Sequence, residues 1–255
     1  MPIKWKKTEV EMPQGKFTVT HWAKHDPREL LRTIQTPSKL EIKAKPVLLV
    51  HDFGKLRIAT RLMEPTNLPL DITQHRDPHY LFDRLKQMAD QRLSIIETPV
   101  AFIENQQGMV GLTTIWKKRT ISLPAFFKSR KVNAQQKVEV SKKAMRLLAK
   151  LHANGFAHGH PHPYNFVINK RRGNVQFIDY VLTQDLPEPY GGPNKTAHHL
   201  AAAILFPRGR PKVRGKYDDR KDQMHRKLTN DFMSEYEQAL DRLKAKIEKR
   251  ARSGK

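Results

Sequence analysis

The strongest constraint on the fold is the order of elements between residues 134 and 180. In the stretch "AQQKVEVSKKAMRLLAKLHANG" (134–155) apolar residues recur at spacings of three and four, which predicts a helix. The pair Asn154-Gly155 supplies its C-terminal stop. A histidine-rich loop, "HGHPHPYN" (158–165), follows directly, and then come two short strand-like runs separated by a turn at "NKRRGN". Any fold for this chain must accommodate a long helix, this loop and a hairpin in that order.

Around this segment, strands dominate the first half of the sequence and helices the second. Runs such as "KFTVTHW", "PVLLV" and "LRIATRLM" are rich in β-branched and apolar residues, as strands are. Asp-Pro pairs at 26–27 and 77–78 mark helix starts. The pattern predicts a two-lobed α+β protein. We place a strand-rich N-lobe at 1–116, with an N-terminal extension over 1–36, and a helical C-lobe at 117–255.

Charge limits the partners more than any other bulk property. The 255 residues include 48 Lys and Arg against 25 Asp and Glu, a formal net charge of +23. Such a field attracts polyanions, so nucleic acid or a ribonucleoprotein is the favoured partner and an anionic membrane surface a lesser one. There are no cysteines, which excludes disulfides and thiolate metal sites. No apolar run is long enough for a membrane span or a signal peptide, so a cytoplasmic location is expected.

The segment 134–180 resembles the catalytic segment of the protein-kinase-like superfamily. It is most similar to the atypical branch that includes RIO kinases, aminoglycoside phosphotransferases and lipopolysaccharide-core sugar kinases. There the loop reads approximately H-G-D-x-x-x-x-N, followed by a hairpin and I-D-[FWY]. His158-Gly159 matches the first two positions, Asn165 the asparagine, and Asp179 the aspartate 14 residues later. The resemblance implies a kinase-like fold in which Asn165 and Asp179 hold Mg²⁺ during phosphoryl transfer from ATP.

Two positions depart from that pattern. The residue five before Asn165 is His160, where the family has the aspartate that orients the attacking hydroxyl. A neutral imidazole can accept one hydrogen bond, but it brings no negative charge and can become cationic. The strand "IATR" carries Arg61 where the family has a phosphate-contacting lysine, and the next helix offers Asp83 or Asp90 instead of its glutamate partner. These departures predict weak or absent catalysis, with His160 as the candidate catalytic group.

The nucleotide would meet two further positions if the resemblance holds. Arg61 would face the phosphates, although a solvent-facing strand arginine is the simpler reading. Ile115 lies in "TTIWKKRTI" (113–121), where the resemblance places the hinge whose backbone meets an adenine ring. ATP and Mg²⁺ are therefore the possible cofactors.

The histidine run has a competing explanation. His158, His160 and His162 alternate, so on an extended strand they would share one face, as ligands of a transition metal do. No convincing further ligand completes such a site. The resemblance instead implies that His158 packs beneath the loop.

A basic loop over 206–227 precedes a final helix expected at 228–250. Within the loop, "PRGRPKVRGK" (207–216) resembles an AT-hook, whose R-G-R-P core enters the minor groove of A·T-rich DNA. The candidate nucleic-acid contacts are Arg208, Arg210, Lys212 and Arg214. A solvated basic loop is the alternative.

Three functions remain open from the sequence. The first is a pseudokinase or nucleotide-binding scaffold that acts with nucleic acid or a ribonucleoprotein. The second is an active but divergent ATP-dependent phosphotransferase acting on a protein or a small molecule. The third is a DNA-binding protein that uses the AT-hook-like loop.

Overall fold

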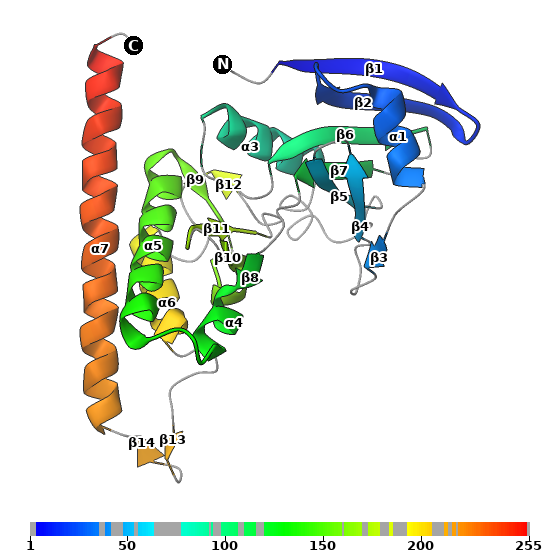
Figure 1. The fold of residues 1–255 in the computed structure, drawn as a ribbon. Coiled ribbons are helices and arrows are strands. Elements are labelled where there is room, and N and C mark those ends of the chain that lie inside the picture. Colours follow the sequence, from blue (N-terminus) through cyan, green and yellow to red (C-terminus); the bar gives the residue numbers. More distant parts are fainter. Residues whose placement is uncertain are drawn as a thin grey trace. The chain divides into compact units, whose positions relative to one another are not determined.

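The computed structural model describes residues 4–35, 39–41, 48–53, 56–63, 78–91, 93, 98–106, 110–115, 120–159, 161–169, 173–178, 184–185, 193–205, 212–213, 216–217 and 219–253. The chain divides into two compact units, Met1–Lys118 and Arg119–Lys255 (Figure 1). The expected division at 116/117 lies two residues from this boundary. The mixture of helices with an antiparallel sheet confirms the α+β class.

The first unit is built on a seven-stranded antiparallel sheet with the order β1-β2-β6-β7-β5-β4-β3. Its strands are β1 Trp5–Met12, β2 Gly15–Trp22, β3 Lys39–Glu41, β4 Leu48–Phe53, β5 Leu56–Met63, β6 Pro99–Asn105 and β7 Val110–Ile115. Strands β1 and β2, which fall within the expected extension 1–36, are part of this sheet, since β2 pairs along β6. The reason is hydrophobic, because Val10 and Val19 are buried in the same core cluster as Ile58 and Ile103.

Two helices pack against this sheet. Helix α1 (Pro27–Gln35) contributes Leu30 and Leu31 to the cluster that contains Ile103. Helix α3 (Pro78–Asp90) places Phe82 against Phe102, with ring centroids 5.0 Å apart. Because Phe102 and Ile103 are neighbours on one strand, their side chains point to opposite faces of the sheet. The sheet is therefore covered on both faces, and both helices begin at the Asp-Pro pairs that the sequence indicated.

The second unit surrounds a long helix, α5 (Ala134–Ala153). A capping box starts it: the Asn133 side chain accepts from the Gln136 N–H, and the Gln136 side chain accepts from the Asn133 N–H. The other elements are α4 Leu123–Lys128, α6 Pro193–Leu205, α7 Asp219–Arg252, the 3₁₀ turn η1 Pro163–Asn165, and the short strands β8 Thr120–Ser122, β9 Phe156–Ala157, β10 Phe166–Asn169, β11 Val175–Phe177 and β12 Gln184–Asp185. The strands form a sheet β11-β10-β8 and a pair β12-β9.

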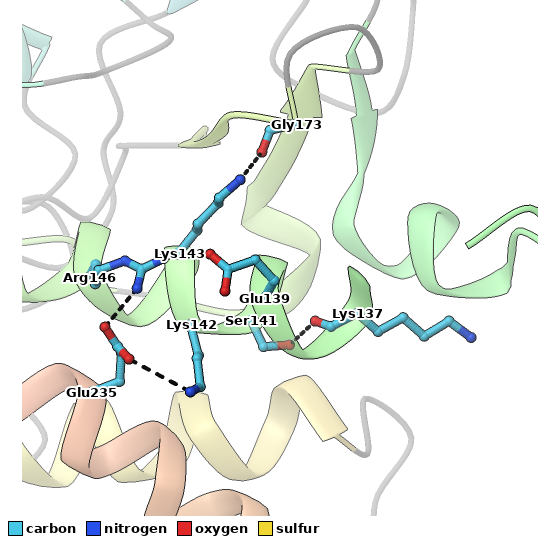
Figure 2. Close-up of polar contacts among 8 residues, drawn as sticks. All are labelled: Lys137, Glu139, Ser141, Lys142, Lys143, Arg146, Gly173 and Glu235. Carbon is cyan, nitrogen blue, oxygen red and sulfur yellow. Dashed lines mark hydrogen bonds and ion pairs between the residues drawn. The ribbon is translucent and has the colours of Figure 1, made fainter. Parts of the chain in front are cut away.

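Polar contacts fasten α7 to α5. Arg146 Nη1 donates to Glu235 Oε1 at 2.7 Å, and Lys142 Nζ lies 3.9 Å from Glu235 Oε2 (Figure 2). Near the end of α5, a buried hydrogen bond of 2.7 Å joins His152 Nδ1 and the Tyr236 hydroxyl. The two sites lie on the same stretch of α7, so they fix that helix along its middle.

The beginning of α7 corrects the expected basic loop at 206–227. The helix starts at Asp219, not at residue 228. Helix-forming lysine, arginine and glutamine residues dominate "DRKDQMHRKL", and its aspartates suit the positive end of a helix dipole. Upstream, β13 (Lys212–Val213) and β14 (Lys216–Tyr217) form a small antiparallel hairpin. None of the described helices is both long and apolar enough to cross a membrane.

Candidate functional site

The histidine-rich loop begins with a buried structural histidine. His158 is fully buried, and its ring lies 4.5 Å from the Phe177 ring. Its Nε2 lies 3.0 Å from the carbonyl oxygen of Ile178. Since that carbonyl can only accept, Nε2 carries the proton and donates it. The expectation that His158 packs beneath the loop is confirmed. Gly159 has a φ of 75°, a left-handed conformation that explains the glycine after this histidine.

Asn165 closes the loop from the other end. It is the last residue of η1, and its backbone N–H donates to the His162 carbonyl at 2.8 Å. Its own carbonyl accepts from the Ile178 N–H, also at 2.8 Å. The Asn165 residue is 9 % exposed. This asparagine is thus held at the boundary between the interior and the surface, rather than on a free turn.

Both backbone polar groups of Ile178 are therefore hydrogen-bonded. Its N–H reaches Asn165, and its carbonyl accepts from the His158 ring. These two bonds join the start and the end of the loop to the residue that follows β11. This described stretch ends at Ile178, so Asp179 lies outside the described residues, as does His160. No pattern of polar residues in the sequence pointed to Ile178, because it acts only through its backbone.

His162 also has a structural role. Its Nδ1 accepts from the Tyr164 N–H at 3.4 Å and caps η1. The His162 and Tyr164 rings stack with 6° between their planes and 5.3 Å between their centroids. Over the part of the chain that the structure describes, no three His, Asp or Glu side chains gather as metal ligands would. The alternating metal site would need His160, which lies outside the described residues.

The hairpin β10–β11 is tied to α5 by a lysine that sequence reasoning missed. Lys143 Nζ donates to the Gly173 carbonyl at 3.4 Å (Figure 2). Gly173 has a φ of 62° and occupies the turn of "NKRRGN".

A second lysine of α5, Lys150, lies seven residues after Lys143, and burial lowers its pKa. The spacing of two lysines by seven residues on one helix is the signal that would have placed both on the same face.

In the first unit, Arg61 and Ile115 lie on opposite faces of the sheet. Ile58 is the direct partner of Ile115, whereas Arg61 pairs with Leu112, which in turn pairs with Phe102. Side chains three apart on a strand point to opposite faces, so Arg61 lies on the face that α3 covers. Both residues are partly buried. Along α3, Asp83 and Asp90 are exposed.

The backbone N–H of Ile115 is already hydrogen-bonded. It donates to the Thr98 carbonyl at 2.9 Å. An adenine ring meeting Ile115 could therefore not accept a hydrogen bond from this N–H without displacing the Thr98 carbonyl. The rest of the expected hinge, 116–119, lies outside the described residues.

Of the four candidate nucleic-acid contacts, only Lys212 is described, as the first residue of β13. Arg208, Arg210 and Arg214 lie outside the described residues. The AT-hook-like segment 207–216 therefore contains β13 and one antiparallel residue pair, Val213 with Lys216.

Comparisons with known proteins place the fold. No family model and no curated protein match the sequence. Among solved structures, the chain is similar to WaaP in complex with acyl carrier protein, with a TM-score of 0.51 and 14% sequence identity. The match covers 89% of this chain and 94% of WaaP. At this level of identity the match shows a similarity of fold alone. In total 1007 solved chains match, so the fold by itself does not select a function.

Proposed function

We propose that this chain is a kinase-like scaffold that retains the nucleotide- and metal-holding part of a phosphoryl-transfer site and has little or no catalytic activity. We further propose that it acts together with nucleic acid or a ribonucleoprotein. One observation carries the first proposal: the Ile178 carbonyl accepts from the His158 ring, and the Ile178 N–H donates to the Asn165 carbonyl. Such a clamp keeps the loop and the residue after β11 together, as a shared metal site between Asn165 and Asp179 would need.

The residues fit Mg²⁺ in their chemistry. An asparagine oxygen and an aspartate carboxylate are hard oxygen ligands of the kind that Mg²⁺ binds beside nucleotide phosphates. The small exposed fraction of Asn165 suits a ligand that is held in place before the metal arrives. When bound, Mg²⁺ would neutralise phosphate charge on ATP.

The proposed loss of catalysis rests on His160. An aspartate at this position would accept a hydrogen bond from the acceptor hydroxyl and add a negative charge near the metal. An imidazole offers one acceptor nitrogen when neutral and repels the metal when protonated. Arg61 is a second departure, because its planar fork binds phosphate with a geometry different from that of a lysine ammonium.

An active, divergent phosphotransferase is the second candidate. It is favoured by the intact packing of the loop: His158 is buried and donates to Ile178, which a chain that had lost all use of the loop would not need. In this case His160 would orient the hydroxyl as a neutral base.

Turnover measurements separate the two candidates. Phosphate release from ATP would be followed for the wild type and for His160→Asp and Asp179→Ala, each with Mg²⁺. A scaffold predicts no turnover in the wild type and a gain in His160→Asp. An active enzyme predicts wild-type turnover that Asp179→Ala abolishes. Wild-type turnover that Asp179→Ala leaves unchanged would contradict both, because the metal would then be held elsewhere.

A further inference from the structure

We propose that the last three turns of α7, residues 241–252, form a cationic arm that binds the phosphate backbone of nucleic acid. The proposal deepens the proposed association with nucleic acid by assigning it a surface. It does not depend on the nucleotide site. It also moves the contact away from the AT-hook-like segment that the sequence suggested.

The packing of α7 against its own unit ends at Leu240. Tyr236, Ala239 and Leu240 are buried, with 0%, 6% and 8% of their surfaces exposed. From Asp241 to Arg252 every residue is exposed except Leu243, which is partly buried. At a rise of about 1.5 Å per residue, these twelve residues continue the helix for about 18 Å. The long red end of α7 in Figure 1 is this arm.

Positive charge lies in a stripe along the arm. The segment "DRLKAKIEKRAR" holds six Lys or Arg residues against two acidic ones. At about 100° per residue, Arg242, Lys246 and Lys249 fall within a narrow sector of the helix. Asp241 and Glu248 lie about 110–130° from the centre of this sector. The stripe itself therefore contains no carboxylate.

The spacing of the cations along the arm also fits a polyanion. Arg242 and Lys246 are four residues apart, as are Lys246 and Arg250, and like charges at this spacing destabilise a helix. Lysine and arginine near a helix C-terminus interact favourably with its dipole, but that effect is confined to the last turn. The stripe begins about two turns before that last turn, at Arg242, whose Nε donates to the Gln238 carbonyl at 3.0 Å. Phosphates along the arm would relieve this repulsion.

A nucleic acid fits the arm better than a membrane surface does. A helix that lies in the bilayer interface needs a broad apolar face, usually with aromatic residues. The arm has only two large apolar side chains, Leu243 and Ile247, and no aromatic residue. Leu243 is already partly buried. The nucleic-acid backbone requires only the cations, which contact phosphates without reading sequence.

The test compares two variants that lose the same charge. The stripe variant carries Arg242→Gln, Lys246→Gln and Lys249→Gln. The control carries Arg130→Gln, Lys131→Gln and Lys227→Gln, three exposed cations outside the arm. Glutamine is a good helix former, so circular dichroism should show the same helix content in both. Binding of the full chain to a labelled 20-nucleotide RNA and to a DNA duplex of the same length would be measured by anisotropy at several salt concentrations.

The stripe variant should lose at least tenfold in affinity, and its slope of log K against log salt should become shallower by about 2–3, for three lost phosphate contacts. The control should keep most of its affinity and its slope. Equal losses in both variants would overturn the proposal, because net charge alone would then explain binding. So would an absence of wild-type binding, or binding restricted to anionic phospholipid vesicles tested in parallel.

The same proteins distinguish this proposal from the proposed nucleotide site. The stripe variant should bind Mg²⁺ and ATP as the wild type does, whereas Asp179→Ala should keep its nucleic-acid affinity. Loss of nucleic-acid binding in Asp179→Ala would contradict the assignment to the arm.

Discussion

His158 and Ile178, twenty residues apart in sequence, are joined by a hydrogen bond of 3.0 Å from the buried imidazole to the backbone carbonyl. His158, the first histidine of the loop, therefore has a structural role. It also connects the loop to β11, next to the residue expected to hold a metal.

Replacing His158 by alanine should destabilise the protein. The change leaves the Ile178 carbonyl without its ring donor and opens a cavity beside Phe177, which together should cost about 2–4 kcal/mol of unfolding free energy. Urea unfolding measures the difference. His162→Ala is the matched control, because His162 is more exposed and its contact is a longer cap; it should cost less than about 1 kcal/mol. Equal costs would show that His158 does not anchor the loop.

The ion pair of Arg146 and Glu235 should contribute a modest coupling between α5 and α7. Their side chains are 37% and 17% exposed, so solvent screens part of the attraction. Burial alone would lower the pKa of Arg146, but the hydrogen bonds that it donates to Glu235 and Glu139 raise the pKa above its usual value. A double-mutant cycle of Arg146→Met and Glu235→Gln should give a coupling of about 0.5–1 kcal/mol that declines with salt. A coupling near zero would mean that apolar residues alone stabilise the contact between α5 and α7.

His25 should make stability depend on pH. Burial lowers its pKa below the ordinary value, with the charges of Lys24 and His21 adding to the effect, and its ring stacks on Trp22 at 5.4 Å. Because the unfolded chain takes up a proton that the folded chain resists, stability is full above about pH 6.5, the unfolded pKa, and falls as the pH drops below it. Proton NMR of the His25 ring should give a pKa below 6.5. A pKa at or above 6.5 would contradict this account, and His25→Phe should flatten the pH dependence if it is correct.

Local patterns in the sequence predicted many of the helices and strands of both units. The capped helix α5, the Asp-Pro starts of α1 and α3, and the hairpin after the histidine run all follow from periodicity and turn residues. Strand β1 was missed because "WKKTEVEM" carries charges on its exposed face, which mask the alternation that buries Val10. The early start of α7 was missed because proline and glycine upstream made a basic segment look like one loop.

The candidate site was less accessible to sequence reasoning. Motif spacing singled out Asn165, and the structure brings its backbone together with Ile178. The clamp itself runs through backbone groups, which every residue carries, so no residue type could reveal it. The sequence named Arg61 and Ile115 as nucleotide contacts without knowledge of the strand register. That register places their side chains on opposite faces of the sheet.

The most direct measurement of the central claim is calorimetry of ATP binding with and without Mg²⁺, on the wild type and on Asp179→Ala. The account predicts binding by the wild type that depends on Mg²⁺ and is weakened at least tenfold in the variant, since the variant removes one of the two proposed metal ligands. Unfolding in urea should show equal stability for the two proteins. No binding at millimolar ATP, or binding that is unchanged in Asp179→Ala, would contradict a retained nucleotide site at Asn165 and Asp179.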